Sequence, residues 1–305
     1  MDHSHSRRSL PSHAWLGIAV LLIAQLLYFL HSRFIEIWLT PIMWTGYILA
    51  CDGLVYIIRG RSWLTARRRE FPLLAILSVG VWLIFEAYNL HLRNWVYQGL
   101  PTSPWLRDFG YFWAFATIMP GVFETADLVE AILERKTRSQ AARSRPGSAG
   151  PEWAWFLTGA ALVSIPLALP EGIASSLFGA VWLGFAFLLD PIQRRLGYSG
   201  FRQDLQDGRI QRVVALLLGG LLCGLLWETW NYQAFVAQGG HWIYTIPAAL
   251  RVFGWHFGQM PLFGLLGFPP FALELEAFYV ILREFLGGDR IWRPHRNPHQ
   301  PPEFS

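Results

Sequence analysis

Residues 212–231 read RVVALLLGGLLCGLLWETWN, and residues 71–90 read FPLLAILSVGVWLIFEAYNL. Each stretch is long and apolar enough to cross the hydrocarbon core of a bilayer, which takes about 20 residues in a helix. Lipid offers the backbone no hydrogen-bond partners, so a spanning stretch of this kind must be helical. Both stretches end in the pattern Glu-x-aromatic-Asn. They therefore predict a helical membrane protein that carries acidic residues within its spans.

Composition supports this class for the whole chain. The 305 residues are 53% hydrophobic and 15% charged, whereas soluble domains carry about 25% charged residues. Such a composition excludes a disordered chain and a disulfide scaffold. The remaining candidate spans are 14–31, 37–58, 109–133, 153–170, 173–190 and 251–281. The sequence therefore predicts an all-α, polytopic membrane protein with about eight transmembrane helices.

The positions of the basic residues predict the orientation. If both termini face the cytoplasm, all but four of the 25 Lys and Arg residues lie on the cytoplasmic side. The four exceptions are Arg33, Arg93, Arg107 and Arg251. This asymmetry follows the positive-inside rule and predicts a multi-pass protein of the cell membrane with both termini cytoplasmic. Because the basic residues occupy short loops between spans, the net charge of +4 does not indicate a nucleic-acid partner.

One polar segment divides the chain into two halves. Residues 134–152 read ERKTRSQAARSRPGSAGPE, a basic stretch that ends in Gly, Pro and Ser and is typical of a flexible linker. The predicted organisation is an N-terminal membrane repeat at 1–133, this cytoplasmic linker at 134–152, a C-terminal membrane repeat at 153–286 and a polar tail at 287–305.

The two halves share motifs in the same order, which indicates an internal duplication. The matched positions are Trp44 and Asp52 with Trp182 and Asp190, Glu86 and Asn89 with Glu228 and Asn231, Trp95 and Tyr97 with Trp242 and Tyr244, Arg107 and Phe109 with Arg251 and Phe253, and Pro120 and Glu124 with Pro270 and Glu274. Each half has four predicted spans, so both halves enter the membrane in the same orientation. We therefore expect two parallel four-helix repeats with a site between them.

Ionisable residues within spans are costly and are candidates for a functional site. Glu86 and Glu228 fall in the outer half of the predicted membrane, and Glu124 and Glu274 fall nearer the cytoplasm. These four are the candidate catalytic carboxyls, since a carboxyl group can act as a general acid. The candidate substrate-binding residues are Asn89, Asn231, Trp82, Tyr88, Trp227, Trp230, Asp52, Arg107 and Arg251. Asp190, which precedes Pro191, is interpreted as an interfacial residue.

Two structural alternatives stay open at this point. Glu86 with Arg107, and Glu228 with Arg251, are placed to form salt bridges that join neighbouring helices. Trp and Tyr collect at membrane interfaces, so Trp95, Tyr97, Trp105, Trp242 and Tyr244 are interpreted as belt or lid residues. The prolines Pro120, Pro261, Pro269 and Pro270 predict kinks in the fourth and eighth spans.

No motif for a metal or nucleotide cofactor is present, so no cofactor and no metal site are predicted. HExxH, Walker A and GxSxG patterns are absent from the sequence, and the HxxxH spacing occurs only at His295 and His299, in the polar tail. The expected partners are membrane lipid and a small hydrophobic substrate.

The order of motifs within each half is similar to that of the integral-membrane lycopene cyclase family of carotenoid biosynthesis. In that family a Pro is closely followed by paired acidic residues. Here the corresponding residues are Trp95, Tyr97, Pro120 and Glu124 in the first half, and Trp242, Tyr244, Pro270, Glu274 and Glu276 in the second. The resemblance covers about 40 residues of each half. It implies a cofactor-free cyclisation that is started by an acid.

Three functions are consistent with these features. The first is an intramembrane acid catalyst that cyclises or isomerises an isoprenoid or another lipid. The second is a proton-coupled transporter of a small hydrophobic or cationic solute, as parallel repeats and kinked helices suggest. The third is a non-catalytic membrane scaffold in which every buried carboxyl is ion-paired with an arginine.

Overall fold

The computed structural model describes residues 8–137, 151–247 and 254–292. Within these ranges the chain is predominantly helical, which confirms the predicted all-α class. The first half contains α1 (Ser12–Phe29), α2 (Arg33–Arg59), α3 (Trp63–Ala66), α4 (Phe71–Leu92), β1 (Trp95–Gln98), α5 (Pro104–Ala116) and α6 (Ile118–Thr137). The second half contains α7 (Glu152–Ala168), α8 (Glu171–Ala174), α9 (Phe178–Arg195), α10 (Phe201–Gln206), α11 (Ile210–Val236), β2 (His241–Tyr244), β3 (His256–Phe257), β4 (Met260–Pro261), η3 (Leu262–Gly267), α12 (Phe268–Phe285) and α13 (Gly288–Trp292).

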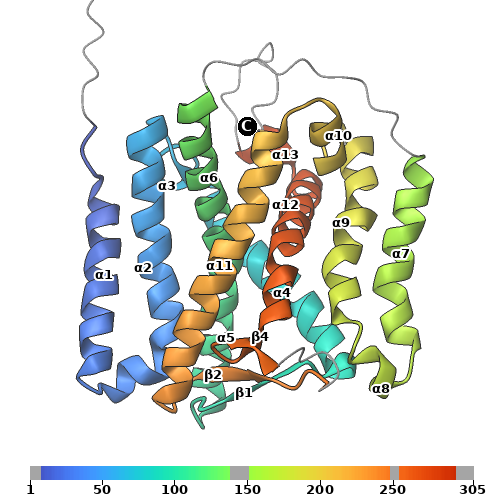
Figure 1. Cartoon of the computed structure of the whole chain (residues 1–305). Helices are drawn as coiled ribbons and strands as arrows, with labels where there is room; N and C mark the ends of the chain where they lie inside the picture. Colours follow the sequence, from blue (N-terminus) through green and yellow to red (C-terminus); the bar gives the residue numbers. More distant parts are fainter. Residues whose placement is uncertain (1–7, 138–150, 248–253, 293–305) are drawn as a thin grey trace, which may run out of the picture.

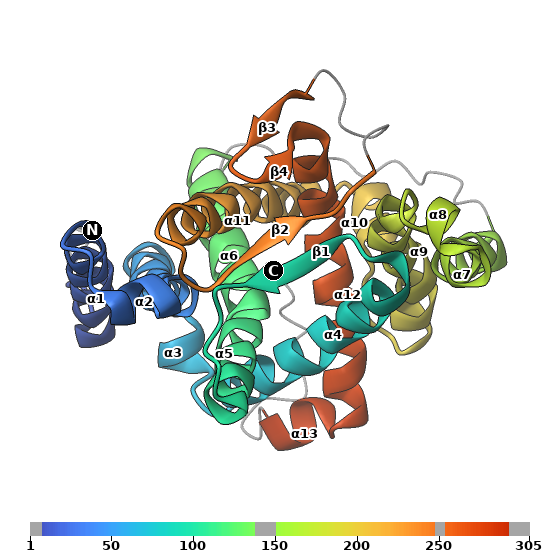
Figure 2. The same cartoon turned by 90° about the horizontal axis from the view of Figure 1, so that it is seen from below.

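The long helices run between two ends of the molecule (Figure 1). One end carries α3, α10 and α13 and is called the α3–α10 end below. The other carries α8 and the four strands and is called the strand end. Seen from the strand end, α4, α6, α11 and α12 form the centre, with the pairs α1–α2 and α7–α9 on opposite flanks (Figure 2).

Five helical segments in the described ranges are long and apolar enough to cross a membrane: Ser12–Phe29, Arg33–Arg59, Phe71–Leu92, Ile210–Val236 and Leu262–Phe285. The structure differs from the predicted spans at three places. The predicted span 109–133 is broken at Thr117 into α5 and α6, three residues before Pro120. The predicted spans 153–170 and 173–190 correspond to α7, which has 17 residues, and to α9, which ends in charged residues. The last span begins at Leu262 rather than at 251. The total of eight spans therefore stays a prediction.

Helices extend into the predicted linker and into the predicted tail. Helix α6 continues to Thr137 and α7 begins at Glu152, so both ends of the predicted linker 134–152 are helical. The predicted tail 287–305 begins with the short helix α13. The rest of both segments lies outside the described residues.

Two small antiparallel sheets occur where only loops were predicted. Strand β1 pairs with β2 from the other half of the chain, with Trp95 opposite Tyr244 and Tyr97 opposite Trp242. Side chains alternate between the two faces of a strand, so these four aromatic residues share one face of the β1–β2 ribbon. The hairpin β3–β4 forms the second sheet. The residues that were interpreted as an interfacial belt thus join the two halves.

Glycines allow each flanking helix pair to pack closely. A Cβ atom added at Gly17 in α1 would lie 2.6 Å from the carbonyl oxygen of Gly46 in α2. A Cβ atom added at Gly159 in α7 would lie 2.8 Å from the carbonyl oxygen of Gly184 in α9. The same glycine contact therefore occurs in both halves.

This packing predicts that Gly159→Ala destabilises the protein. The new methyl group would lie 2.2 Å from the backbone nitrogen of Leu188, so α7 and α9 must separate. We expect a loss of about 1–3 kcal/mol, typical of overpacking, seen as a lower midpoint of thermal unfolding in detergent. The control is Gly80→Ala in α4, where the added atom meets nothing within 4 Å. Equal midpoints for the two variants would contradict this packing.

Candidate functional site

Two asparagines fix the β1–β2 ribbon to the ends of long helices. Asn89 in α4 donates from Nδ2 to the carbonyl oxygen of Trp95 at 2.9 Å and accepts from the backbone nitrogen of Asn94 at 2.8 Å. Asn231 in α11 donates to the carbonyl oxygen of Trp242 at 3.0 Å and accepts from its backbone nitrogen at 2.9 Å. Both amides are thus occupied by backbone groups. They position the strands, in contrast to the substrate contact that was predicted for them.

Glu86 accepts three hydrogen bonds from aromatic side chains. Its Oε1 atom receives the hydroxyl of Tyr97 at 2.5 Å. The same atom receives the indole nitrogens of Trp82 at 2.8 Å and Trp95 at 3.1 Å. Trp82 comes from the preceding turn of α4, whereas Trp95 and Tyr97 come from β1. The carboxyl group of Glu86 is therefore held by neutral donors.

Glu228 occupies the matching position on α11. Its Oε1 atom accepts the hydroxyl of Tyr244 at 2.6 Å. Its Oε2 atom accepts the backbone nitrogen of Gln259, in the turn between β3 and β4, at 3.2 Å. The indole nitrogen of Trp242 donates to the Tyr244 hydroxyl at 2.8 Å. A tyrosine–carboxylate pair thus recurs in both halves.

Both tyrosines line one cavity, called the central cavity below. It has a volume of about 60 Å³. Its wall is almost entirely apolar and is formed by Thr40, Trp44, Trp82, Trp95, Tyr97, Ala114, Phe115, Ile118, Trp182, Trp227, Trp242, Tyr244, Phe268 and Phe271. A pocket of about 380 Å³, called the Gly179 pocket, adjoins it through Trp95, Trp182 and Tyr244. Its volume lies in the range of small-molecule sites, about 300–1,000 Å³.

The aromatic residues that were predicted to bind substrate divide into two groups. Trp82 and Trp227 line the central cavity. Tyr88 instead donates to the carbonyl oxygen of Val163 at 2.9 Å and so joins α4 to α7. Trp230 packs edge-on against Trp44, with ring centroids 5.0 Å apart. Neither Tyr88 nor Trp230 lines the central cavity.

Within the described ranges, none of the four candidate catalytic glutamates lines the central cavity, and Glu124 and Glu274 form no contact with Tyr97 or Tyr244 comparable to those of Glu86 and Glu228. Glu274 in α12 is fully buried and accepts the backbone nitrogens of Phe185 and Ala186 in α9, at 3.1 and 3.3 Å. Glu124 in α6 is fully buried as well. Among the described residues, neither carboxyl forms an ion pair. Glu86 and Glu228 are thus linked to the cavity through their tyrosine partners, whereas no hydrogen bond in the described part of the chain links Glu124 or Glu274 to these tyrosines.

Asp52 and Asp190 make matching structural contacts near the α3–α10 end. Asp52 accepts the backbone nitrogen of Leu64 at 2.9 Å and the hydroxyl of Ser62 at 2.7 Å. Asp190 accepts the backbone nitrogen of Arg202 at 3.2 Å. Each aspartate thus binds the short helix that follows its own helix, α3 for Asp52 and α10 for Asp190. A substrate contact of Asp52 stays a prediction.

The salt-bridge alternative is not observed for the first half. Glu86 and Arg107 form no ion pair in the described part of the chain, and Arg107 lines a separate cavity of about 60 Å³. Arg251 lies outside the described residues, and so does the proposed pair of Glu228 with Arg251.

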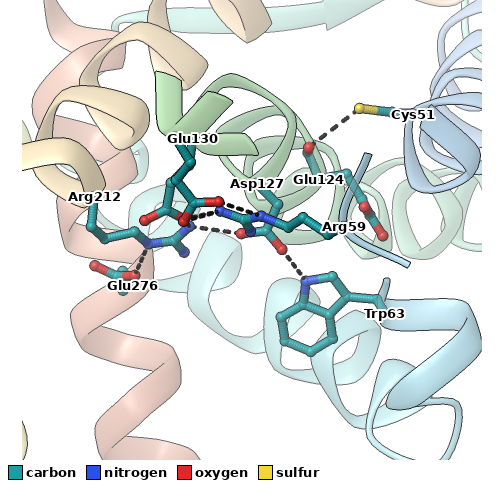
Figure 3. Close-up of polar contacts among 9 residues, drawn as sticks. Cys51, Arg59, Trp63, Glu124, Asp127, Glu130, Arg212 and Glu276 are labelled. Atoms are coloured by element: carbon teal, nitrogen blue, oxygen red, sulfur yellow. Dashed lines mark hydrogen bonds and ion pairs between the residues drawn. The ribbon is translucent and has the colours of Figure 1, made fainter. Parts of the chain in front are cut away.

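Charged side chains of α2, α6, α11 and α12 form one cluster of ion pairs (Figure 3). Arg212 in α11 contacts Asp127 at 2.7 Å, Glu130 at 3.3 Å and Glu276 at 2.7 Å. Arg59 in α2 contacts Glu130 at 3.1 Å. The ion pairs of this cluster hold four helices, α2, α6, α11 and α12, together. Sequence reasoning did not predict it, although Asp127 and Glu130 lie at the i,i+3 spacing of one helix face.

Glu70, which precedes α4, belongs to a second cluster, at the α3–α10 end. It binds Arg67 at 2.6 Å and also contacts Tyr279 and Arg283 of α12. Burial raises the pKa of Glu70, but the hydrogen bonds and positive charges of its partners outweigh burial and lower it to about 2.

This low pKa predicts an acid-sensitive contribution to stability. The unfolded Glu70 has an ordinary pKa of 4.5, so its stabilisation is complete above that pH and is lost as pH falls towards 2. The shift corresponds to about 3 kcal/mol at neutral pH. Glu70→Gln should therefore unfold more easily at pH 7 and lose less stability between pH 5 and pH 3 than the wild type. Glu171→Gln, which removes an exposed pair with Arg93 at 3.4 Å, is the control. Parallel pH profiles for wild type and Glu70→Gln would contradict this assignment.

Among the described residues, no group of three or more His, Cys, Asp or Glu side chains is arranged to hold a metal ion. No family model matches the chain, and neither does any curated protein or solved structure. The similarity to integral-membrane lycopene cyclases therefore depends only on the residues quoted from the sequence.

Proposed function

We propose that this chain is an intramembrane enzyme that protonates a carbon–carbon double bond of an isoprenoid or related lipid, and so isomerises or cyclises it. One observation carries the proposal: Tyr97, which is hydrogen-bonded to Glu86, and Tyr244, which is hydrogen-bonded to Glu228, both line one aromatic cavity. In the proposed reaction, one tyrosine–carboxylate pair acts as the acid and the other as the base on an apolar substrate in this cavity.

The surroundings of the carboxyls suit a proton donor. In the described part of the chain, neither Glu86 nor Glu228 is ion-paired, so protonating either one breaks no salt bridge. Burial raises the pKa of Tyr97 and of Tyr244 well above the ordinary value, and the neighbouring glutamate raises each further. The hydroxyls therefore stay protonated and pass a proton between carboxyl and substrate.

The reaction needs no oxidant and no cofactor. The proton forms a C–H bond with the electron pair of one double bond, which leaves a carbocation. A second double bond attacks the cation and forms a ring, or the cation loses a neighbouring proton and gives an isomer. The opposite tyrosine–carboxylate pair accepts that proton. The faces of Trp44, Trp227 and Phe271 stabilise the positive charge while it exists.

The proposed arrangement in the membrane is eight passes in two parallel repeats. The glycine contacts of the flanking helices, the aspartate contacts and the tyrosine–carboxylate pairs all occur twice, at equivalent positions. Arginines are concentrated at the α3–α10 end, which supports a cytoplasmic location for that end of a cell-membrane protein. Membrane lipid then has direct access to the site.

The test is solvent-proton incorporation into a lipid product. Membranes that contain the chain are incubated with an extract of linear isoprenoids in H₂O or D₂O, and the products are measured by mass spectrometry. The wild type should form an isomer of a substrate that is one mass unit heavier in D₂O. Glu86→Gln should slow this product by about 100-fold or more, as for loss of a general acid. Tyr97→Phe should slow it by at least tenfold.

Glu171→Gln, which lies outside the cavity, is the control and should keep full activity. Identical lipid profiles for wild type and empty membranes would overturn the proposal. An unchanged lipid composition with altered movement of a lipid across the bilayer would instead favour the transporter.

A further inference from the structure

Three cavities form a row through the strand end. The central cavity shares Thr40, Tyr97 and Trp242 with the cavity that Arg107 lines, called the Arg107 cavity. On its other side it shares Trp95, Trp182 and Tyr244 with the Gly179 pocket. The two outer cavities have no lining residue in common. The central cavity therefore lies between them, and both tyrosines stand at its borders.

The outer cavities are built from equivalent positions but differ in size. Ile37, Trp38 and Pro41 line the Arg107 cavity, whereas the residues 138 positions later, Ser175, Ser176 and Gly179, line the Gly179 pocket. Large side chains in the first half thus correspond to small ones in the second. This difference in side-chain size accounts for the small volume of the Arg107 cavity, about 60 Å³, and the larger volume of the Gly179 pocket, about 380 Å³.

The Arg107 cavity, the smaller of the two outer cavities, is lined by residues with buried polar atoms that lack hydrogen-bond partners among the described residues. His241 is 6% exposed, and its Nε2 atom has no hydrogen-bond partner among the described residues. The hydroxyl of Thr40, which is 7% exposed, also has none in the same ranges. A buried polar atom without a partner costs about 1–3 kcal/mol. The guanidinium of Arg107 adds a positive charge to the same wall, while the residues that line the Gly179 pocket carry no charge.

We propose that the row of cavities binds a chain-like lipid lengthwise, with a small oxyanion end group in the Arg107 cavity and the bulkier apolar end in the Gly179 pocket. Arg107 and Thr40 donate hydrogen bonds to the end group. An oxygen of the end group shares a proton with Nε2 of His241, which gives that atom a hydrogen-bond partner. The middle of the chain then lies beside Tyr97 and Tyr244. This inference rests on the proposed function only for what happens to that middle segment.

The experiment measures binding, without turnover, by native mass spectrometry of the full chain in detergent. The probes are an all-trans C20 isoprenoid carboxylic acid, its methyl ester and the corresponding monophosphate. The wild type should bind the acid or the monophosphate at least tenfold more tightly than the ester, and the better of the two identifies the end group. Arg107→Gln should abolish this preference and leave ester binding unchanged, which also shows that the variant is folded. Arg93→Gln, at another arginine of the strand end, should retain the preference.

A second pair of variants tests the apolar end. Gly179→Leu places a side chain where a Cβ atom meets nothing within 4 Å, inside the Gly179 pocket. It should weaken binding of all three probes at least tenfold. Gly172→Leu in α8, where an added Cβ atom is equally free of contacts, should not.

Equal affinities for acid, monophosphate and ester in the wild type would overturn the inference, as would equal effects of Gly179→Leu and Gly172→Leu. If the wild type incorporates deuterium into a lipid product but shows no preference for the anionic probes, only the present inference fails. If it prefers the anionic probes but incorporates no solvent proton, only the proposed function fails.

Discussion

The pairing of β1 with β2 is the interaction on which the site depends. Each strand has only four residues, and they lie in opposite halves of the chain. A two-stranded ribbon is marginal by itself, so its backbone needs further anchors. Asn89 and Asn231 supply them from the ends of α4 and α11. With these anchors in place, residues almost 150 positions apart in sequence form one wall of one cavity.

Glu86 and Glu228 occupy equivalent positions in the two halves but have different surroundings. Trp82, Trp95 and Tyr97 all donate to the same oxygen atom of Glu86, and this residue is partly exposed. Glu228 is fully buried and uses its second oxygen to hold the β3–β4 turn. The two carboxyls are therefore not interchangeable. Glu86 has the freer oxygen and fits a proton donor, whereas Glu228 combines a proton site with an anchor.

The sequence predicted the helical class, the recurrence of Glu-x-aromatic-Asn and the aromatic residues near it. It did not reveal β1 and β2, because a four-residue strand shows too little alternation and its partner is far away in sequence. Hence Tyr97 and Tyr244 were interpreted as interfacial residues although they border the cavity. Pro120 predicted a kink in the fourth span, because proline lacks the N–H group that would continue the helix; the structure has a break into two helices at Thr117, three residues earlier.

The carboxyl groups at the two ends of the molecule have different kinds of hydrogen-bond partner, and this difference is consistent with the proposed acid chemistry. At the α3–α10 end, carboxyl groups such as those of Asp127 and Glu70 form ion pairs with arginines and hold helices together. At the strand end, Glu86 and Glu228 are bound by hydroxyl, indole and backbone donors. A carboxyl bound to arginine is poorly suited to hold a proton, whereas one bound to neutral donors can gain and lose it without breaking an ion pair. Among the described residues, no arginine lines the central cavity, so under the proposed function the carboxyls linked to it can take part in acid chemistry and its indole faces can stabilise a carbocation.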